Sequence, residues 1–284
     1  MTLRYQAEAV ETRYWMPGDD YLGIISHALE GRVRDGDVVA VSEKALSTAK
    51  GRIVDESSVK PGFFACFLAV FWMRLVWGFF LGRVCRLKEE NIQRLRRYPK
   101  KEGCAHKQVA LWYSSFLQAL VWGSEGGIDA SNLPYSYVCL PLDDPRGTAE
   151  EIARHLERRL GRRVVVLIVD TDKTYSCGGF HFTHRPSALK GIHSFFGVVA
   201  YVAGRALKLR RRSTPLAVAG SRMDVDLALD MAEAAHRCRG SGAGPTVWDV
   251  AETFGVSITG VTCGMLRGLR HKPVVILRRR KHTR

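Results

Sequence analysis

The chain has 284 residues, of which 46% are hydrophobic, so it can bury a sizeable core and is not a disordered tail. Its 43 Lys and Arg residues outnumber its 28 acidic residues, and the net charge is +15. This balance suits an anionic partner, namely a nucleotide, a nucleic acid or a membrane surface, although a solvated basic surface would produce it equally well.

The seven cysteines are scattered along the chain and form no C-x-x-C pair, which excludes a zinc ribbon and a thioredoxin motif. An odd, scattered set is typical of buried thiols in a reducing compartment. The N-terminal stretch MTLRYQAEAVETRYW contains no apolar signal core. We therefore expect a cytoplasmic protein.

The first elements expected along the chain are a capped helix and a buried strand. PGDDYLGIISHALEG predicts a helix that is capped by Asp19 or Asp20 and ends at Gly31. Its expected apolar face consists of Leu22, Ile25 and Leu29. The apolar run at residues 38–41 then predicts a buried strand, and the polar residues 42–44 predict a loop after it.

The middle of the chain, residues 62–123, has a helical pattern, with exposed turns expected around residues 94–101. Its first part, GFFACFLAVFWMRLVWGFFLG at residues 62–82, is long enough to cross a bilayer. Arg74 near its middle opposes a membrane span, because a charge at that depth costs about 2.5 to 3.5 kcal/mol. A pair of buried helices, or a surface that touches a membrane, is equally compatible with this sequence.

A second helix and a second strand follow. DDPRGTAEEIARHLERRLGRR predicts a helix with Thr148 as its cap and Glu151 completing a capping box. Its expected apolar face consists of Ile152, Leu156 and Leu160. The run from Val164 to Asp170 predicts a strand that is buried on both faces. Asp170 would then lie at the carboxyl end of that strand, where open α/β sheets bind ligands.

The last third contains an apolar stretch, the basic run RALKLRRR, a helix and a final strand, KPVVILRRR. The expected apolar face of that helix consists of Leu227, Met231 and Ala235. Residues 246–269 resemble a helix-turn-helix, with Gly255 at the turn and Val261 in the second helix, and would predict DNA binding. Gly260 and Gly264 oppose it by up to about 1 kcal/mol each, and a plain pair of core helices gives the same pattern.

Two acids are candidate metal ligands. Asp129 lies in the glycine-flanked turn EGGIDASN, and Asp170 ends a predicted strand. Mg²⁺ or Mn²⁺ binds through hard oxygen ligands from one or two carboxylates, with phosphate and water completing the shell. Thr171 and Asp172 add a hydroxyl and a further acid beside Asp170. An aspartate in such a turn can equally be a plain turn former.

A histidine pair, His181 and His184 in GGFHFTHRP, follows shortly after Asp170. Such a pair near a metal site could supply ligands. Because no cysteine or further histidine stands at zinc spacing, we favour a polar active-site loop that contacts phosphate or an acceptor carboxylate.

Four stretches together resemble the coenzyme F420-0:L-glutamate ligases, a family of γ-glutamyl ligases. They are PGDD, GDVVAVSEKALSTAKGRIVD, GGIDASN and DDPRGTAEEIARHLERRLGRRVVVLIVDTD. The resemblance covers residues 12–60 and 124–175 well and is most specific in GIDASN and the later DT. It implies a homodimer with an α/β (α+β) γ-glutamyl ligase-like fold and mixed sheets. We expect one ligase-like domain over residues 1–284, with an apolar helical insert at about 62–123 and a basic C-terminal segment at about 205–284.

The resemblance also implies a reaction and a set of site residues. In that family, GTP phosphorylates a substrate carboxylate, the amine of glutamate attacks the acyl phosphate, and two Mg²⁺ or Mn²⁺ ions neutralise the phosphates. By position, Asp129, Asp170 and Thr171 would bind metal. The implied nucleotide contacts are Thr12, Arg13, Tyr14, Trp15, Ser42, Glu43, Thr48 and Asn132.

Departures from the family pattern fall where phosphate and acceptor would bind. The lysine of the family's SKAEGR is Thr48 here, and Lys44 or Lys50 could replace it. The glycine-arginine segment after the family's TDT is KTYSCGG, and the asparagine-alanine before GIDASN is Glu125-Gly126. The alternatives are therefore a ligase for another acceptor, an inactive or repurposed nucleotide-binding homologue, and a nucleic-acid-binding protein that uses the helix-turn-helix-like segment.

Overall fold

A mixed seven-stranded sheet organises the part of the chain that the computed structural model describes, residues 5–186, 189–194 and 197–279. In spatial order its strands are β1 (Tyr5–Thr12), β9 (His271–Arg279), β2 (Val38–Ser42), β5 (Val165–Cys177), β6 (Phe180–Thr183) and β7 (Ile192–Ser194), with β8 (Arg210–Ala219) also paired to β5. β2 and β5 run parallel, as do β6 and β7, whereas the other pairs are antiparallel. The mixed α/β class expected from the sequence is confirmed.

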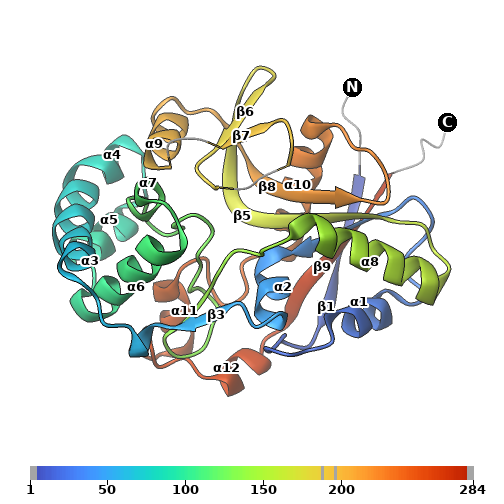
Figure 1. Cartoon of the computed structure of the whole chain (residues 1–284), viewed down its shortest axis with the longest axis horizontal. Helices are drawn as coiled ribbons and strands as arrows, with labels where there is room; N and C mark the ends of the chain where they lie inside the picture. Colours follow the sequence, from blue (N-terminus) through green and yellow to red (C-terminus); the bar gives the residue numbers. More distant parts are fainter. Residues whose placement is uncertain (1–4, 187–188, 195–196, 280–284) are drawn as a thin grey trace.

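Helices cover both faces of this sheet, and those of one face can be followed at the right of Figure 1. That face carries α1 (Tyr21–Leu29), α2 (Glu43–Ala49) and α8 (Pro145–Leu160), and the other carries α10 (Val225–Arg239). Asp20 caps α1 by accepting a hydrogen bond from the backbone N–H of Gly23 at 3.0 Å. The predicted cap and apolar face of this helix are therefore confirmed.

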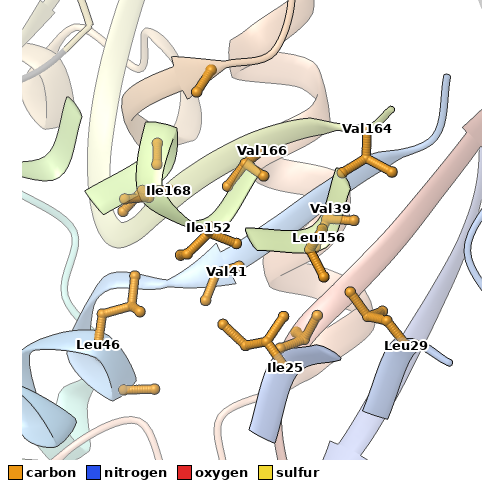
Figure 2. Close-up of a cluster of buried hydrophobic side chains, with 14 of the residues drawn as sticks. Ile25, Leu29, Val39, Val41, Leu46, Ile152, Leu156, Val164, Val166 and Ile168 are labelled. Carbon is orange, nitrogen blue, oxygen red and sulfur yellow. The ribbon is translucent and has the colours of Figure 1, made fainter. Parts of the chain in front are cut away.

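The segments 38–41 of β2 and 165–169 of β5 are apolar because both faces of the sheet are covered there. Side chains alternate along a strand. Val166 and Ile168 of β5 therefore join a core with α1 and α8, whereas Leu167 and Val169 join the core beneath α10. Figure 2 shows the first of these cores, which contains Ile25, Leu29, Val39, Val41, Ile152 and Leu156.

The start of α8 differs from the prediction. Asp144 caps the helix by accepting a hydrogen bond from Gly147 N at 2.8 Å, and Pro145 occupies the first helical position. Thr148 lies inside the helix, where its hydroxyl donates to the carbonyl of Asp144 at 2.7 Å. The predicted capping box of Thr148 and Glu151 is therefore wrong, because the Asp-Pro pair already starts the helix one turn earlier.

Helices from the middle of the chain form a separate lobe beside the sheet, at the left of Figure 1. The lobe comprises η1 (Glu56–Ser58), α3 (Phe63–Phe67), the π-helix η2 (Leu68–Leu81), α4 (Gly82–Val84), α5 (Glu89–Arg96), α6 (Lys100–Tyr113), α7 (Phe116–Ala119) and α9 (Val198–Ala206), with the short sheet of β3 (Ile53–Asp55) and β4 (Tyr137–Cys139). The helical pattern of this region is confirmed. The expected turns at 94–101 are mostly helical, because Ile92 and Leu95 anchor α5 in the interior of the lobe.

The predicted helix-turn-helix at residues 246–269 does not form. The segment folds as two short helices, α11 (Val247–Phe254) and α12 (Cys263–Arg267). Val261 lies between them, outside any helix, and is buried in a small apolar cluster. Gly260, a residue that lowers helix stability by about 1 kcal/mol, also lies in the irregular stretch between the two helices. The segment covers the core and presents no second helix long enough to enter a DNA groove.

Candidate functional site

The carboxyl end of β2 and the end of the parallel part of β5 meet at a cavity of about 340 Å³, here called the Asp170 cavity. Because β9 runs antiparallel to β2, its first residues lie at the same edge of the sheet. The cavity walls include the predicted site residues Tyr14, Trp15, Ser42, Thr48, Asp129, Asn132, Asp170 and Thr171. Segments far apart in the sequence therefore converge on one site, as the motif resemblance implied.

Asp170 lies at an irregularity within β5. The parallel pairing with β2 ends at Val169, and the register with β8 shifts on both sides of Val169 and Asp170. Such a bulge bends a strand and re-aims its side chains. Asp170 and Thr171 both line the cavity. The strand continues to Cys177, so the prediction that it ends at Asp170 is wrong, although the parallel part does end there.

A buried arginine neutralises Asp170. The guanidinium of Arg185 contacts the carboxylates of both Asp170 and Glu43 and has no exposed surface. Burial alone would raise the pKa of Asp170, but the Arg185 charge and the backbone N–H of Thr171 lower it below its usual value. Burial raises the pKa of Glu43 to about 7, against the opposing effect of Arg185.

Three predicted site residues lie off the cavity wall. Residues 42–44 do not form a loop, because α2 begins directly after β2 and Glu43 suits the positive end of its dipole. Glu43 is buried behind the wall, where it holds Arg185 and accepts a hydrogen bond from Leu142 N at 2.9 Å. Thr12 and Arg13 also lie outside the lining, and Arg13 donates two hydrogen bonds of 2.8 Å to Asp19.

The glycine-flanked turn places Asp129 against the sheet. Asp129 pairs with Cys139 of β4 through backbone hydrogen bonds of 3.1 and 2.9 Å. Ser131 N donates to Asp129 Oδ1 at 2.7 Å and fixes the carboxylate. Gly127 has a φ of 95°, and a Cβ at this position would overlap the guanidinium of Arg185. A glycine is therefore required for the Asp129 turn and the Arg185 side chain to pack together.

Lys44 shows that the Asp129 turn binds a cation. Its ammonium forms an ion pair with Asp129 and donates to Ser131 Oγ at 2.7 Å and to Ser131 O at 3.0 Å. A carboxylate, a hydroxyl and a carbonyl thus surround one positive charge, and these are the oxygen donors that Mg²⁺ prefers. The one group of three acids that lies close enough to share an ion, among the residues described, is Glu90, Asp249 and Glu252, and Arg94 forms ion pairs with all three.

Asn132 ties a distant loop to the site. Its Oδ1 accepts a hydrogen bond from Ala243 N at 2.8 Å, and its Nδ2 donates to Gly244 O at 2.8 Å. Tyr14 donates its hydroxyl to the backbone carbonyl of Asn132 at 2.8 Å. The loop between α10 and α11 therefore forms a wall of the Asp170 cavity.

Basic side chains on this wall were not recognised from the sequence. The cavity that the predicted acids line is also lined by Arg239 at the end of α10, Arg270 just before β9 and Lys272 in β9. His236 and His271 also line it, and burial lowers the pKa of each to about 4, so both are neutral at pH 7. The net positive lining complements a polyphosphate. No local motif marks these residues, because they meet only when β9 returns to the sheet.

His181 and His184 do not form a polar active-site loop. His181 lies in β6, buried, with Nδ1 at 2.9 Å from Ser176 Oγ. His184 is also buried, and burial lowers its pKa to about 4. The short turn Gly178-Gly179 makes β6 a hairpin partner of β5, so the pair enters the protein interior instead of the Asp170 cavity.

A second cavity of about 590 Å³ opens beside the first, between the helical lobe and α11. We call it the aromatic cavity, because its walls include Tyr98, Trp122, Tyr135, Tyr137 and Trp248. Asp129 and Ser131 line both cavities. The Asp129 turn is therefore the partition between a basic chamber and an aromatic one.

A buried ionic network lies in the wall of the aromatic cavity. His106 bridges two carboxylates, with Nδ1 at 2.7 Å from Glu56 and Nε2 at 3.2 Å from Glu125. The ammonium of Lys107, which has no exposed surface, contacts Glu125 at 2.5 Å and donates to the carbonyl of Ala119 at 2.8 Å. Burial would lower the pKa of His106, but Glu56 and Glu125 raise it to about 10. His106 is therefore a cation at neutral pH.

Residues 9–244 match the sequence model of the F420-0:gamma-glutamyl ligase family, and the chain belongs to this family. The family is one of ligases, and its name connects it with coenzyme F420 biosynthesis. The resemblance seen in the motifs is thereby confirmed.

Individual relatives extend this assignment. The uncharacterized protein MJ1361 of Methanocaldococcus jannaschii is 34% identical over 283 residues, which cover 96% of this chain and 96% of the relative. The coenzyme F420:L-glutamate ligase of Methanopyrus kandleri is 27% identical over 174 residues, or 60% of each chain. That of Archaeoglobus fulgidus is 27% identical over 184 residues, which cover 63% of this chain and 65% of the relative.

Proposed function

We propose that this protein is a GTP- and divalent-metal-dependent ligase that joins an amino acid to a carboxylate substrate through a γ-glutamyl-type amide bond. The main observation in support is that Asp129, Asp170 and Thr171 line the same cavity as several basic side chains. In this reaction GTP transfers its γ-phosphate to the carboxylate. The amine then displaces phosphate from the acyl phosphate, so that GDP and phosphate are released. Membership in a family of ligases supports this class of reaction.

Mg²⁺ or Mn²⁺ would be held by the carboxylates of Asp129 and Asp170 and the hydroxyl of Thr171, which are hard oxygen ligands. The residues fit such an ion, because the oxygens of Asp129 and Ser131 already surround the ammonium of Lys44. A bound metal would neutralise phosphate charge during transfer. Lys44 would then be released from Asp129 to contact a phosphate.

The basic wall of the Asp170 cavity would bind the rest of the nucleotide. Arg239 and Lys272 lie on that wall and can donate charge-assisted hydrogen bonds to phosphate oxygens. Asn132, which was expected to contact the nucleotide, would act by holding the loop around residues 241–244 against it.

The aromatic cavity would bind the carboxylate acceptor. Its aromatic walls suit a planar or apolar body. Its shared partition, Asp129 and Ser131, would bring the acceptor carboxylate next to the terminal phosphate in the other chamber. The acceptor we would test first is the coenzyme F420 precursor, because the relatives from M. kandleri and A. fulgidus are named as coenzyme F420:L-glutamate ligases.

Calorimetric titration of GTP, with and without Mn²⁺, tests the proposal. We expect binding that requires the metal and is weakened at least tenfold in Asp170→Asn. Asp143→Asn removes an exposed carboxylate outside both cavities and should bind like the wild type. Unchanged metal-dependent binding in Asp170→Asn would disprove the site assignment. If GTP does not bind under either condition, the fold has been kept without this chemistry.

A further inference from the structure

The helix Phe63–Val84 has an apolar face that the protein does not cover. It comprises α3, η2 and α4, and it is the one helix in the described ranges that is long and apolar enough to cross a membrane. Only 33% of its most apolar window is buried. A core helix of a soluble domain would be mostly buried, so this helix requires another explanation.

The opposite side of the same helix is fixed to the protein. Leu68, Met73 and Trp77 are buried in the helical lobe. Trp77 donates its indole N–H to the carbonyl of Leu120 at 2.8 Å. Arg74, the charge that opposes a span, donates to the carbonyl of Tyr98 at 2.8 and 2.6 Å. Because one side is packed against α5 and α6, lipid cannot surround this helix on all sides.

The exposed side is a continuous aromatic surface, here called the phenylalanine face. Its members on the helix recur every four residues, and α6 and α7 extend it: Phe63, Phe67, Phe71, Leu75, Phe79, Trp112, Tyr113 and Phe116. The ring centroids of Phe67 and Phe71 are 5.0 Å apart. Phe64, which is also exposed, links α3 to α7, with its ring centroid 5.6 Å from that of Phe116. The helices that carry this face belong to the lobe at the left of Figure 1.

Positive charge borders this face at both ends. Lys60 precedes the helix, Arg83 and Arg86 follow its last aromatic residues, and all three are exposed. The guanidinium of Arg96 lies 4.4 Å from the ring centroid of Phe79. No acidic residue occurs between Glu56 and Glu89. An apolar surface with a basic border is the arrangement found in helices that lie in the plane of a membrane interface.

Charge also decides between a lipid surface and a second copy of this chain. A two-fold dimer places the same patch of both subunits in contact. Its basic border would therefore meet an identical basic border, and no acidic residue lies between Glu56 and Glu89 to compensate the charge. A membrane with anionic headgroups offers opposite charge at the border and hydrocarbon at the centre. We propose that the phenylalanine face is a peripheral binding surface for membranes that contain anionic lipid.

Flotation of the full chain with vesicles tests this proposal. We expect the wild type to float with vesicles containing phosphatidylglycerol, and to float much less with pure phosphatidylcholine or in high salt. Phe71→Ser should weaken vesicle binding about tenfold, since it removes one aromatic ring that would insert into the membrane. The matched control is Phe180→Ser in the β5–β6 hairpin, because Phe180 is 47% exposed and Phe71 is 46% exposed. This control should bind like the wild type.

A second variant leaves the helix packing untouched. Lys60→Glu combined with Arg83→Glu should reduce binding to anionic vesicles without changing the thermal unfolding midpoint. Wild-type protein that ignores anionic vesicles would overturn the proposal, as would equal binding by Phe71→Ser and Phe180→Ser. A dimer that Phe71→Ser dissociates, in protein that does not bind vesicles, would assign the face to a second copy instead.

Discussion

The contact between Gly127 and Arg185 makes the sequence of the Asp129 turn a steric requirement. In Gly127→Ala the new methyl group would overlap the Arg185 guanidinium. We expect the free energy of unfolding to fall by about 2 to 4 kcal/mol, and nucleotide binding to weaken. Gly123→Ala is the matched control, because Gly123 also has a positive φ but open space around it, and it should cost only about 1 kcal/mol. Equal losses in urea unfolding would show that Arg185 does not constrain this turn.

His106 should make the stability of the helical lobe depend on pH. Its pKa is raised from 6.5 to about 10 by Glu56 and Glu125 after the opposing effect of burial. A group whose pKa is raised on folding contributes stability that is complete below the unfolded pKa and is lost as pH rises through the folded pKa. Between about pH 7 and 10, the wild type should therefore lose on the order of a few kcal/mol more than His106→Gln. Parallel pH profiles of the two proteins in denaturant titrations would contradict this prediction.

Among the secondary-structure elements, helix α8 packs against the core of the sheet, and its stability depends on its N-cap residue. Asp144→Ala removes the cap that accepts from Gly147 N and should lower the free energy of unfolding by about 1 kcal/mol. Asp143→Ala removes only an exposed ion pair with Arg52 and should change it by less than about 0.5 kcal/mol. If thermal unfolding shows equal effects for both variants, Asp144 does not stabilise α8 as its cap.

The elements that could be predicted are those with a strong local signal. The apolar runs of β2 and β5, the cap of α1 and the apolar face of α10 all follow from side-chain periodicity and capping chemistry. The length of β5 could not be predicted, since its polar half is stabilised by pairing with β8 and β6. The helix-turn-helix prediction failed because the apolar spacing of Val261 serves packing between irregular segments.

The residues of the candidate site likewise divide into those that the sequence could predict and those that it could not. Asp129, Asp170 and Asn132 lie in short motifs, and the structure brings all three to one cavity. Arg185 has no such motif, because its partners Glu43 and Asp170 lie in other segments of the chain. A buried cation of this kind is specified by tertiary structure and can be recognised only after the strands are assembled.

At the scale of the whole molecule, ligand binding should raise stability by mass action. GTP with Mn²⁺ at about 100 times the dissociation constant should stabilise the native state by about 2.7 kcal/mol. For a chain of this size the unfolding temperature should rise by several degrees, since 1 kcal/mol corresponds to roughly 2 to 4 °C. Asp129→Asn should show no such rise, and calorimetric scans that give the same shift for both proteins would be incompatible with a nucleotide site at Asp129.

The proposed catalytic site and the proposed membrane-binding surface lie on different parts of the molecule. The Asp170 cavity opens at an edge of the sheet, whereas the phenylalanine face lies on the helical lobe. The aromatic cavity has walls from the lobe and from α11. A membrane bound by the lobe would therefore leave the sheet and its basic chamber in solution.

The partition formed by Asp129 and Ser131 has a consequence for the affinities of the two cavities. Any displacement of that turn by an occupant of one chamber alters the other chamber, so the two affinities are linked by a single coupling free energy. Reciprocity then requires that nucleotide change the apparent affinity for acceptor by the same factor as acceptor changes that for nucleotide. In the proposed reaction, the dissociation constant measured for either ligand would consequently depend on the concentration of the other.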